Sequence, residues 1–315
     1  MTSLGAKTET AATANGAGVA VNADTDPKVQ VAHVVARARA ATEAYENTDQ
    51  ERVDDAVRAL AWAIYKPENA EMLARLAVED TGLGDVTSKI TKNTRKTFGT
   101  LRDLLRAKTV GIISDEPERG LVKYGKPVGV VGAVCPSTNP AATPVNKAMM
   151  ALKGGNAVII APSPAGYETT SKTVGLMRAE LKKSGHPEDL VQVLPAPVSK
   201  ELTQALMEQV DLAVVTGSQN NVKRAMQSGT VAIGVGAGNV PVIIDASADL
   251  DAAAEKICAS KIFDNSTSCS SENSVVILDE IYEDAIAALK RAGGWRCNPQ
   301  ERERVRETLW VNGKL

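Results

Sequence analysis

The stretch VGVVGAVCPSTNPAATPVNKAMMALKGGNAVIIA, residues 128–161, decides the fold of this chain. It opens and closes with short apolar, β-branched runs at residues 128–134 and 157–161, and the segment between them has the length of a helix. Two such strands joined by a helix are typical of a βαβ unit, whose parallel strands are buried on both faces. The stretch therefore predicts an α/β fold built on a parallel sheet.

The same alternation of strand and helix continues toward the C-terminus. Further strands are expected at residues 190–194, 211–215, 231–234, 241–245 and 274–279. Helices that would cover both faces of the sheet are expected at residues 142–153, 167–184, 199–208, 219–228, 249–262 and 281–292. In open sheets of this kind ligands bind at the carboxyl ends of strands, so the loops there are where chemistry is expected.

The N-terminal part has a different composition. Residues 1–26 contain almost no large apolar side chains, which predicts a disordered tail because burial cannot offset the entropy of ordering. From Val29 to Leu76, apolar residues at three- and four-residue spacing predict two or three amphipathic helices. The glycines of Thr81-Gly82-Leu83-Gly84 are expected to end this block. Residues 89–105 are expected to form a basic helix whose charges face solvent.

Composition excludes several classes of function. The 315 residues, 43% of them apolar, suffice for a large core and two domains. The net charge of -2, without a basic stripe, argues against nucleic-acid and anionic-membrane partners. The four cysteines and two histidines lack metal-ligand spacing, so no metal is expected. No apolar run is long enough to span a bilayer and no secretory signal is recognisable, which is typical of a cytoplasmic protein with reduced thiols.

The first strand-end loop with unusual composition is CPSTNP, residues 135–140. Its two prolines fix a turn that presents the Asn139 side-chain amide, which is suited to donate a hydrogen bond to a developing oxyanion. A turn or helix-cap role is the commoner explanation of such an asparagine, and both interpretations stand at this point. Cys135 is interpreted as a packing residue at the strand end.

Two further loops are rich in glycine. Thr216-Gly217-Ser218 follows a strand and precedes a helix, whose free amides can meet a pyrophosphate or a nicotinamide. The stretch GVGAGNVP, residues 234–241, allows close approach of backbone to a ligand, or marks a bulge or tight crossover. A strand rather than a helix follows it, so it is not a dinucleotide-binding fingerprint.

Cys269 lies in FDNSTSCSSE, residues 263–272, a polar loop between an apolar helix and an apolar strand. Buried structural cysteines usually lie on apolar stripes, as Cys258 does with Leu250 and Ile257. A thiol flanked by hydroxyl residues is instead placed to lose its proton and attack an electrophile. Cys269 is therefore the candidate nucleophile, the alternative being a chance cysteine in a polar loop.

Taken in order, these segments resemble the aldehyde dehydrogenase superfamily, and specifically its CoA-acylating branch, found in acetaldehyde dehydrogenases and bifunctional aldehyde-alcohol dehydrogenases. The resemblance runs from about residue 30 to the end of the chain. It is carried by PSTNP at 136–140, IGVGAGNVPV at 233–242 and KIFDN leading to CSSE across 261–272, with TGLG at 81–84 in support.

The resemblance implies a Rossmann-type nicotinamide-cofactor domain with the N-terminal helices over residues 27–232. It implies an α/β catalytic domain carrying Cys269 over residues 233–315. Cys269 is then the nucleophile, and Asn139 forms an oxyanion hole with the Cys269 backbone amide. The residues implied to contact the cofactor are Pro136, Ser137, Thr138, Ser163, Thr216, Gly217, Ser218 and Gly236.

The implied reaction passes through a thiohemiacetal and an acyl-enzyme thioester on Cys269. In hydrolytic relatives a glutamate activates the water that attacks this thioester, whereas in acylating relatives the thiol of coenzyme A attacks. Val235 stands where that glutamate would be and cannot accept a proton, which favours coenzyme A as co-substrate. Glu272 is a candidate local base or loop-orienting acceptor, and an ordinary surface carboxylate is the alternative.

NADP and NAD are both candidate cofactors. Many hydrolytic relatives carry a lysine and a glutamate for the adenosine ribose where this chain has Ala161-Pro162-Ser163-Pro164. Without a carboxylate to repel a 2′-phosphate, NADP is admissible, and Ser163 can donate a hydrogen bond to it.

The expected substrate is a short aldehyde, with the oxidation of sulfoacetaldehyde to sulfoacetyl-CoA as one candidate. The alternatives are a hydrolytic or phosphate-linked dehydrogenase or reductase on the same fold, and an inactive nucleotide-binding fragment. Relatives continue well beyond the position of Leu315, so the resemblance implies C-terminal truncation and a homo-oligomer for the full-length form.

Overall fold

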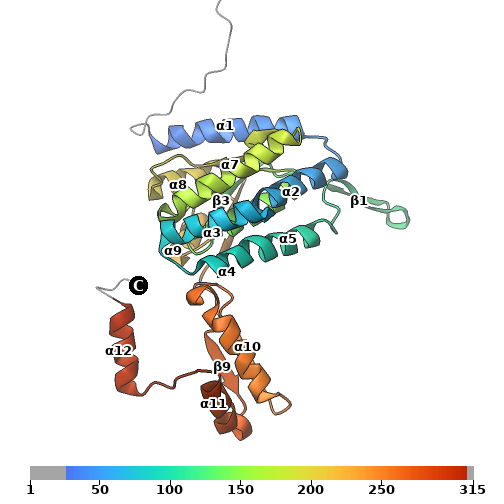
Figure 1. Ribbon diagram of the computed structural model, residues 1–315. Coiled ribbons are helices and arrows are strands. Elements are labelled where there is room, and N and C mark those ends of the chain that lie inside the picture. The colour runs from blue at the N-terminus through green and yellow to red at the C-terminus, as the bar shows by residue number, and fades with distance from the viewer. Residues whose placement is uncertain (1–25, 311–315) are drawn as a thin grey trace, which may run out of the picture.

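The computed structural model describes residues 26–310, whose arrangement is shown in Figure 1. The helices are α1 (Pro27–Tyr45), α2 (Gln50–Tyr65), α3 (Pro67–Thr81), α4 (Val86–Thr91), α5 (Thr97–Leu104), α6 (Ala142–Lys153), α7 (Tyr167–Lys183), α8 (Lys200–Gln209), α9 (Gln219–Met226), α10 (Leu250–Ile262), α11 (Tyr282–Arg291) and α12 (Pro299–Leu309). The strands are β1 (Gly111–Glu116), β2 (Leu121–Gly125), β3 (Val130–Val134), β4 (Ala157–Ala161), β5 (Val191–Val193), β6 (Leu212–Thr216), β7 (Ala232–Val235), β8 (Pro241–Ile244) and β9 (Ser274–Ile277). The predicted disordered tail, residues 1–26, lies outside the described residues apart from Asp26, whose carboxylate caps α1.

One parallel sheet of five strands organises the larger part of the molecule, in the order β5-β4-β3-β6-β7. Val130 of β3 pairs with Ala157 of β4, and Val131 pairs with Leu212 of β6. Every residue of β3 and β4 is buried, as expected when helices cover both faces of a parallel sheet. The predicted α/β fold with a Rossmann-type sheet is confirmed.

The order of the strands reverses at β3. Right-handed crossovers from β3 through β4 to β5 place α6 and α7 on one face, and those from β5 through β6 to β7 place α8 and α9 on the other. The N-terminal helices add to these layers, because α1 packs on α8 while α2 packs on α6 and α7. The loops after β3 and β6 therefore leave toward opposite faces, and such a switch point is where open α/β sheets bind ligands.

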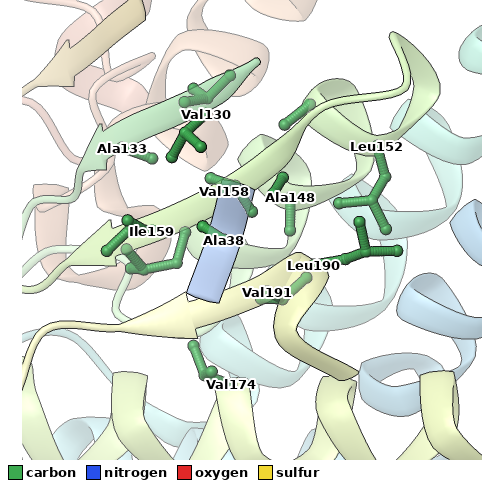
Figure 2. Close-up of a cluster of buried hydrophobic side chains, with 14 of the residues drawn as sticks. Ala38, Val130, Ala133, Ala148, Leu152, Val158, Ile159, Val174, Leu190 and Val191 are labelled. Carbon is green, nitrogen blue, oxygen red and sulfur yellow. The ribbon is translucent and has the colours of Figure 1, made fainter. Parts of the chain in front are cut away.

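The hydrophobic core fills the space between this sheet and its helices. Figure 2 shows side chains of β3, β4 and β5 packed with Ala38 of α1, Leu152 of α6 and Val174 of α7. The core is made largely of Val, Ala, Leu and Ile. No helix within residues 26–310 combines the length and the apolar character needed to cross a membrane.

A second, smaller unit contains β8 and β9, a separate two-stranded parallel sheet in which Pro241 pairs with Ser274. Helices α10 and α11 pack against each other and belong to the part of the molecule drawn below α4 in Figure 1. The following helix, α12, has no buried residue. This unit exposes apolar strand residues, such as Ile243 at 75% and Val276 at 55%.

All of the strands and helices predicted from residue 128 onward are present, each within two residues at both ends. Two parts of the described chain were not predicted: the exposed hairpin of β1 and β2, which precedes residue 128, and helix α12 near the C-terminal end. The expected helix at 89–105 lies across α4, a π-helical turn (Lys92–Lys96) and α5. The expected domain boundary after residue 232 falls inside β7, because Thr216 pairs with Val235 and draws residues 233–235 into the first sheet.

Candidate active site

A cavity of about 390 Å³ opens at the switch point, beside the carboxyl ends of β3, β4 and β6. Its lining contains six of the eight residues predicted to contact a cofactor, namely Pro136, Ser137, Ser163, Thr216, Gly217 and Ser218. The other two, Thr138 and Gly236, lie outside this lining. The three loops are far apart in sequence and meet here because parallel strands end at the same edge of a sheet.

The charged residues that line this cavity, Lys200 and Arg224, are both basic. The Arg224 guanidinium donates to the Lys200 carbonyl at 2.6 Å and to Gln204 Oε1 at 3.1 Å, which fixes its position. Ser218 caps α9 and accepts a hydrogen bond from the Asn221 amide at 3.3 Å. A cavity with two cations, hydroxyl groups and a helix N-terminus is suited to bind phosphate groups.

Lys147 connects the two strands at the switch point. Its buried ammonium donates to the carbonyl oxygens of Val134 at 2.6 Å and Val214 at 2.9 Å, near the ends of β3 and β6. Burial lowers the pKa of this lysine. Lys147 could not be predicted as a site residue from the sequence, because its position within α6 carries no signal of these contacts.

Asn139 begins the turn into α6 and is 8% exposed. Its carbonyl accepts a hydrogen bond from the Thr143 amide at 3.3 Å. The N-cap residue of α6 is Ala141, and the Asn139 side-chain amide makes no hydrogen bond with any other residue in 26–310. The structure thus offers no support for the helix-cap interpretation and leaves this amide available as a donor.

Cys135, directly after β3, and Cys269, in the loop after α10, lie in different environments. Cys135 is buried, its thiol points to the Ala133 carbonyl at 3.7 Å, and burial raises its pKa to about 11. Cys269 is exposed and lies in a turn that is closed by a hydrogen bond from the Ser271 amide to the Ser268 carbonyl at 3.0 Å. The interpretation of Cys135 as a packing residue is confirmed, and a reactive thiol is expected only at the exposed position.

The backbone before Cys269 is strained. Asp264, Asn265 and Ser266 have φ angles of 52°, 52° and 62°, a left-handed conformation that costs a residue other than glycine about 1–2 kcal/mol. Side chains hold this backbone: the Asn265 amide donates to the Gly84 carbonyl at 3.1 Å, and the Ser266 hydroxyl donates to the Lys261 carbonyl at 2.5 Å.

Asp264 is fully buried and lies against the turn between α3 and α4. Its carboxylate pairs with Lys89 Nζ at 3.3 Å and, more closely, with Lys92 Nζ, and it accepts from the Asp85 amide at 3.1 Å and the Thr267 hydroxyl at 2.8 Å. Burial by itself acts to raise the pKa of Asp264, but these bonds outweigh it and lower the pKa.

The expectation that the charges of residues 89–105 face solvent is wrong for two of the lysines. Lys89 and Lys92 are 3% and 2% exposed. One turn apart on the helix, they point to the same side and meet the Asp264 carboxylate. Burial lowers the pKa of Lys92, and the hydrogen bond with Asp264 opposes this shift. Sequence reasoning could not find the pair, because the partner lies more than 170 residues away.

The glycine-rich loop after β7 runs from the cavity to Cys269. A Cβ atom on Gly236 would collide with the Gln219 side chain at the start of α9, at 2.5 Å. A Cβ atom on Gly238 would lie 3.0 Å from the Cys269 carbonyl oxygen. At the end of the loop, the Val240 amide donates to Asn273 Oδ1 at 2.9 Å. Gly236 and Gly238 thus lie close to Gln219 and Cys269 of the chain itself, and the approach of this backbone to a ligand stays a prediction.

Glu272, Cys258 and Cys297 make no contact, among the described residues, that indicates a role for them. One buried carboxylate oxygen of Glu272, Oε2, has no hydrogen-bond partner in the described part of the chain. Cys258 is half-buried on α10, and Cys297 is exposed. Within residues 26–310, no group of three or more His, Cys, Asp or Glu side chains is placed to hold a metal ion.

The sequence profile of the "Aldehyde dehydrogenase family" matches residues 4–302. The chain belongs to the aldehyde dehydrogenase family. The chain is 54% identical over 285 residues to the "Sulfoacetaldehyde dehydrogenase (acylating)" of Cupriavidus necator, an alignment that covers 90% of this chain and 58% of that protein. The chain thus spans less than two thirds of the length of this relative.

Two solved structures extend the comparison. The acetylating aldehyde dehydrogenase of Geobacillus thermoglucosidasius superposes with a TM-score of 0.85 at 35% identity, covering 92% of this chain and 64% of that one. A propionaldehyde dehydrogenase of Rhodopseudomonas palustris, solved with bound CoA and an acylated cysteine, superposes with a TM-score of 0.76 at 28% identity, covering 90% and 64%. The two basic side chains and the hydroxyl groups that line the switch-point cavity fit the phosphates of a nicotinamide dinucleotide.

Proposed function

We propose that this aldehyde dehydrogenase is CoA-acylating and oxidises a short aldehyde to its acyl-CoA through Cys269. The proposal rests on the placement of Cys269. Its thiol is exposed, and its backbone carbonyl lies against Gly238, in the loop that leads from the cofactor cavity. The names of the acylating and acetylating relatives support it.

The Cys269 thiolate adds to the aldehyde carbon, a C–S bond forms, and the carbonyl electron pair moves to oxygen. The Asn139 amide and the Cys269 backbone N–H donate hydrogen bonds to this oxyanion, which stabilises the thiohemiacetal. When bound in the cavity, NAD(P)⁺ supplies the hydride acceptor. Loss of hydride from the thiohemiacetal carbon leaves a thioester on Cys269. The CoA thiolate attacks this thioester, releasing acyl-CoA and the Cys269 thiolate.

Val235 supports CoA rather than water as the acyl acceptor. It is the last residue of β7, directly before Gly236, and its side chain has no atom that accepts a proton. Water is a poor nucleophile without a general base, whereas a thiol is a few per cent ionised at neutral pH and attacks readily. The acyl-enzyme is therefore expected to persist until CoA arrives.

Sulfoacetaldehyde is the proposed substrate, and sulfoacetyl-CoA the product. The support is the name of the Cupriavidus necator relative, at 54% identity over 285 residues. Sulfoacetaldehyde should show a higher kcat/KM than acetaldehyde and succinate semialdehyde in a steady-state panel. Equal values for the three aldehydes would contradict this part of the proposal.

NADP is proposed as the preferred cofactor. The cavity presents the Ser163 hydroxyl together with Lys200 and Arg224, and no carboxylate in its lining would repel a 2′-phosphate. Charge-assisted hydrogen bonds of this kind contribute about 1.5–3 kcal/mol, so Arg224→Gln should lower kcat/KM with NADP roughly 10- to 100-fold and leave that with NAD nearly unchanged. Equal loss with both cofactors would contradict the assignment.

The central experiment measures NADP and NAD reduction by the 315-residue chain with and without CoA, together with Cys269→Ser and the control Cys297→Ser, which removes another exposed thiol. We expect CoA-dependent turnover that Cys269→Ser abolishes and Cys297→Ser retains. Reduction without CoA would indicate a hydrolytic dehydrogenase, and phosphate-dependent reduction a phosphate-linked one. A folded chain that binds nucleotide without turnover would indicate an inactive fragment.

Alkylation tests the choice of nucleophile without turnover. With a pKa of about 11, Cys135 is ionised in only about one molecule in 10⁴ at pH 7, and it is buried. Iodoacetamide should therefore label Cys269 in the native protein and Cys135 only after unfolding, as read by peptide mass spectrometry. Native labelling of Cys135 ahead of Cys269 would overturn the assignment.

A further inference from the structure

Three buried charged side chains lie between the two loops that form the proposed oxyanion hole. Asp264 comes five residues before Cys269, and Lys89 and Lys92 come from α4 and the π-helical turn after it. All three are at most 3% exposed. Isolated charges at such depth are costly, so a cluster that keeps two cations around one carboxylate needs a reason beyond stability.

The two lysines differ in one contact. Both pair with the Asp264 carboxylate, but Lys89 Nζ also lies 3.4 Å from the carbonyl oxygen of Thr138. Thr138 directly precedes Asn139. One ammonium group therefore contacts both the turn that presents Asn139 and the segment that leads to Cys269.

The segment held by Asp264 would not keep its shape alone. Its three consecutive left-handed residues begin at Asp264, and such conformations persist where the surroundings over-determine them. Besides accepting from both lysines, Asp264 donates its own amide to Ser88 Oγ at 3.1 Å. A shift of this segment by even 1 Å would move the Cys269 amide away from the oxygen that Asn139 binds.

We infer that Lys89 is a positioning residue, which together with Asp264 holds the Asn139 turn and the Cys269 loop at the separation that lets both donors reach one oxyanion. This inference rests on the proposed function for the reaction it serves. Lys92 neutralises Asp264 and, among the described residues, makes no hydrogen bond to the 135–140 turn, so it belongs to the anchor and not to the coupling.

Lys89→Met and Lys92→Met form a matched pair, because each removes one buried ammonium and leaves Asp264 with the other. We expect Lys89→Met to lower kcat roughly 10- to 100-fold with little change in KM, as misplacement of catalytic donors does. Lys92→Met should stay within about threefold of wild type. In an Asn139→Ala background, Lys89→Met should lower kcat by less than about a further threefold, since the two residues act on the same step.

Hydrogen exchange provides a readout that does not need turnover. Lys89→Met should raise exchange in peptides covering 137–139, whereas Lys92→Met should leave exchange in those peptides unchanged, because Lys92 makes no hydrogen bond to that turn among the described residues. If Lys89→Met does not fold, Lys89→Gln, which keeps a shorter donor, replaces it in both measurements.

Equal kcat losses in the two lysine variants, additive losses with Asn139→Ala, or unchanged exchange at 137–139 would each overturn the inference. Absence of CoA-dependent turnover in the wild type would instead contradict the proposed function. The exchange pattern would still decide whether Lys89 couples the two loops.

Discussion

The five-stranded sheet and the two-stranded sheet of this molecule are both parallel and both rich in Val and Ile, yet they differ in what covers them. β3 and β4 are buried along their whole length. In contrast, Ile243 of β8 and Val276 of β9 are mostly exposed. Among the described residues, the contiguous hydrophobic core includes none from β8, β9, α10 or α11.

The smaller unit is therefore held in place by polar contacts more than by apolar burial. Only Ala254 of α10 is buried, and only Ala285 and Ala288 of α11. At the junction with the larger unit, the Asp264 carboxylate meets Lys89, Lys92 and the Asp85 amide. Stability should therefore depend on core volume in the first region and on one buried carboxylate in the second.

The largest expected effect tests that anchor. Asp264→Asn leaves two buried lysines without a counter-charge and should lower the free energy of unfolding by about 3–5 kcal/mol. The control is Asp251→Asn, which removes an exposed pair with Arg291 in the same unit and should cost at most about 1 kcal/mol. Urea unfolding measures both free energies, and equal losses for the two variants would contradict the role of Asp264 as the anchor of the smaller unit.

The pH dependence sharpens this test. The pKa of Asp264 in the folded protein lies below its ordinary 3.8. The contribution of its carboxylate to the free energy of unfolding is therefore complete above pH 3.8, and it is lost as the pH falls through the lower pKa of the folded protein. The stability difference between wild type and Asp264→Asn should therefore be constant near neutrality and shrink in acid below about pH 4. A difference that grows in acid would contradict this role.

The next effect compares two isoleucines in the two sheets. Ile159 of β4 is fully buried, and Ile159→Ala should cost about 2–5 kcal/mol, as large-to-small changes in cores do. Ile243→Ala, in exposed β8, should stay within about 0.5 kcal/mol. A cost at Ile243 comparable to that at Ile159 would show that β8 is covered in solution.

The smallest expected effect compares two glycines of one turn. Gly82 and Gly84 have φ angles of 66° and 74°, so alanine at either position costs about 1–2 kcal/mol in backbone strain. A Cβ atom on Gly82 meets nothing, whereas one on Gly84 would lie 1.9 Å from Asp264 Oδ1. Gly84→Ala should therefore destabilise by about 1 kcal/mol more than Gly82→Ala, as measured by thermal unfolding. Equal effects would indicate that Asp264 can shift freely.

Periodicity predicted nearly all of the regular elements after residue 128, because alternating buried strands and helices leave a strong local signal. Before that residue, periodicity missed β1 and β2, whose residues are mostly exposed and gain stability from pairing with each other. It also missed α12, whose sequence PQERERVRETL is mostly charged or polar and which buries no residue. The capping box of Asn298 and Glu301 is a local sequence signal that could have found that helix.

For the candidate site, the polar loop around Cys269 and the strand-end turns were visible in the sequence, since local composition already separates them from core segments. Six of the residues expected at the cofactor line one cavity. Lys89, Lys92 and Lys147 were not found, because a lysine on a helix is ordinarily a surface residue and only its distant partners show otherwise.

The sequence by itself determined the order of strands and helices, the polar setting of Cys269 and the absence of a proton acceptor at Val235, because each depends on residues adjacent along the chain. Only the tertiary structure decided which face each helix covers, that Asn139 caps no helix, and that Asp264 draws two lysines into the interior. These depend on contacts between residues far apart in sequence, where the balance of desolvation and pairing is set by three-dimensional neighbours.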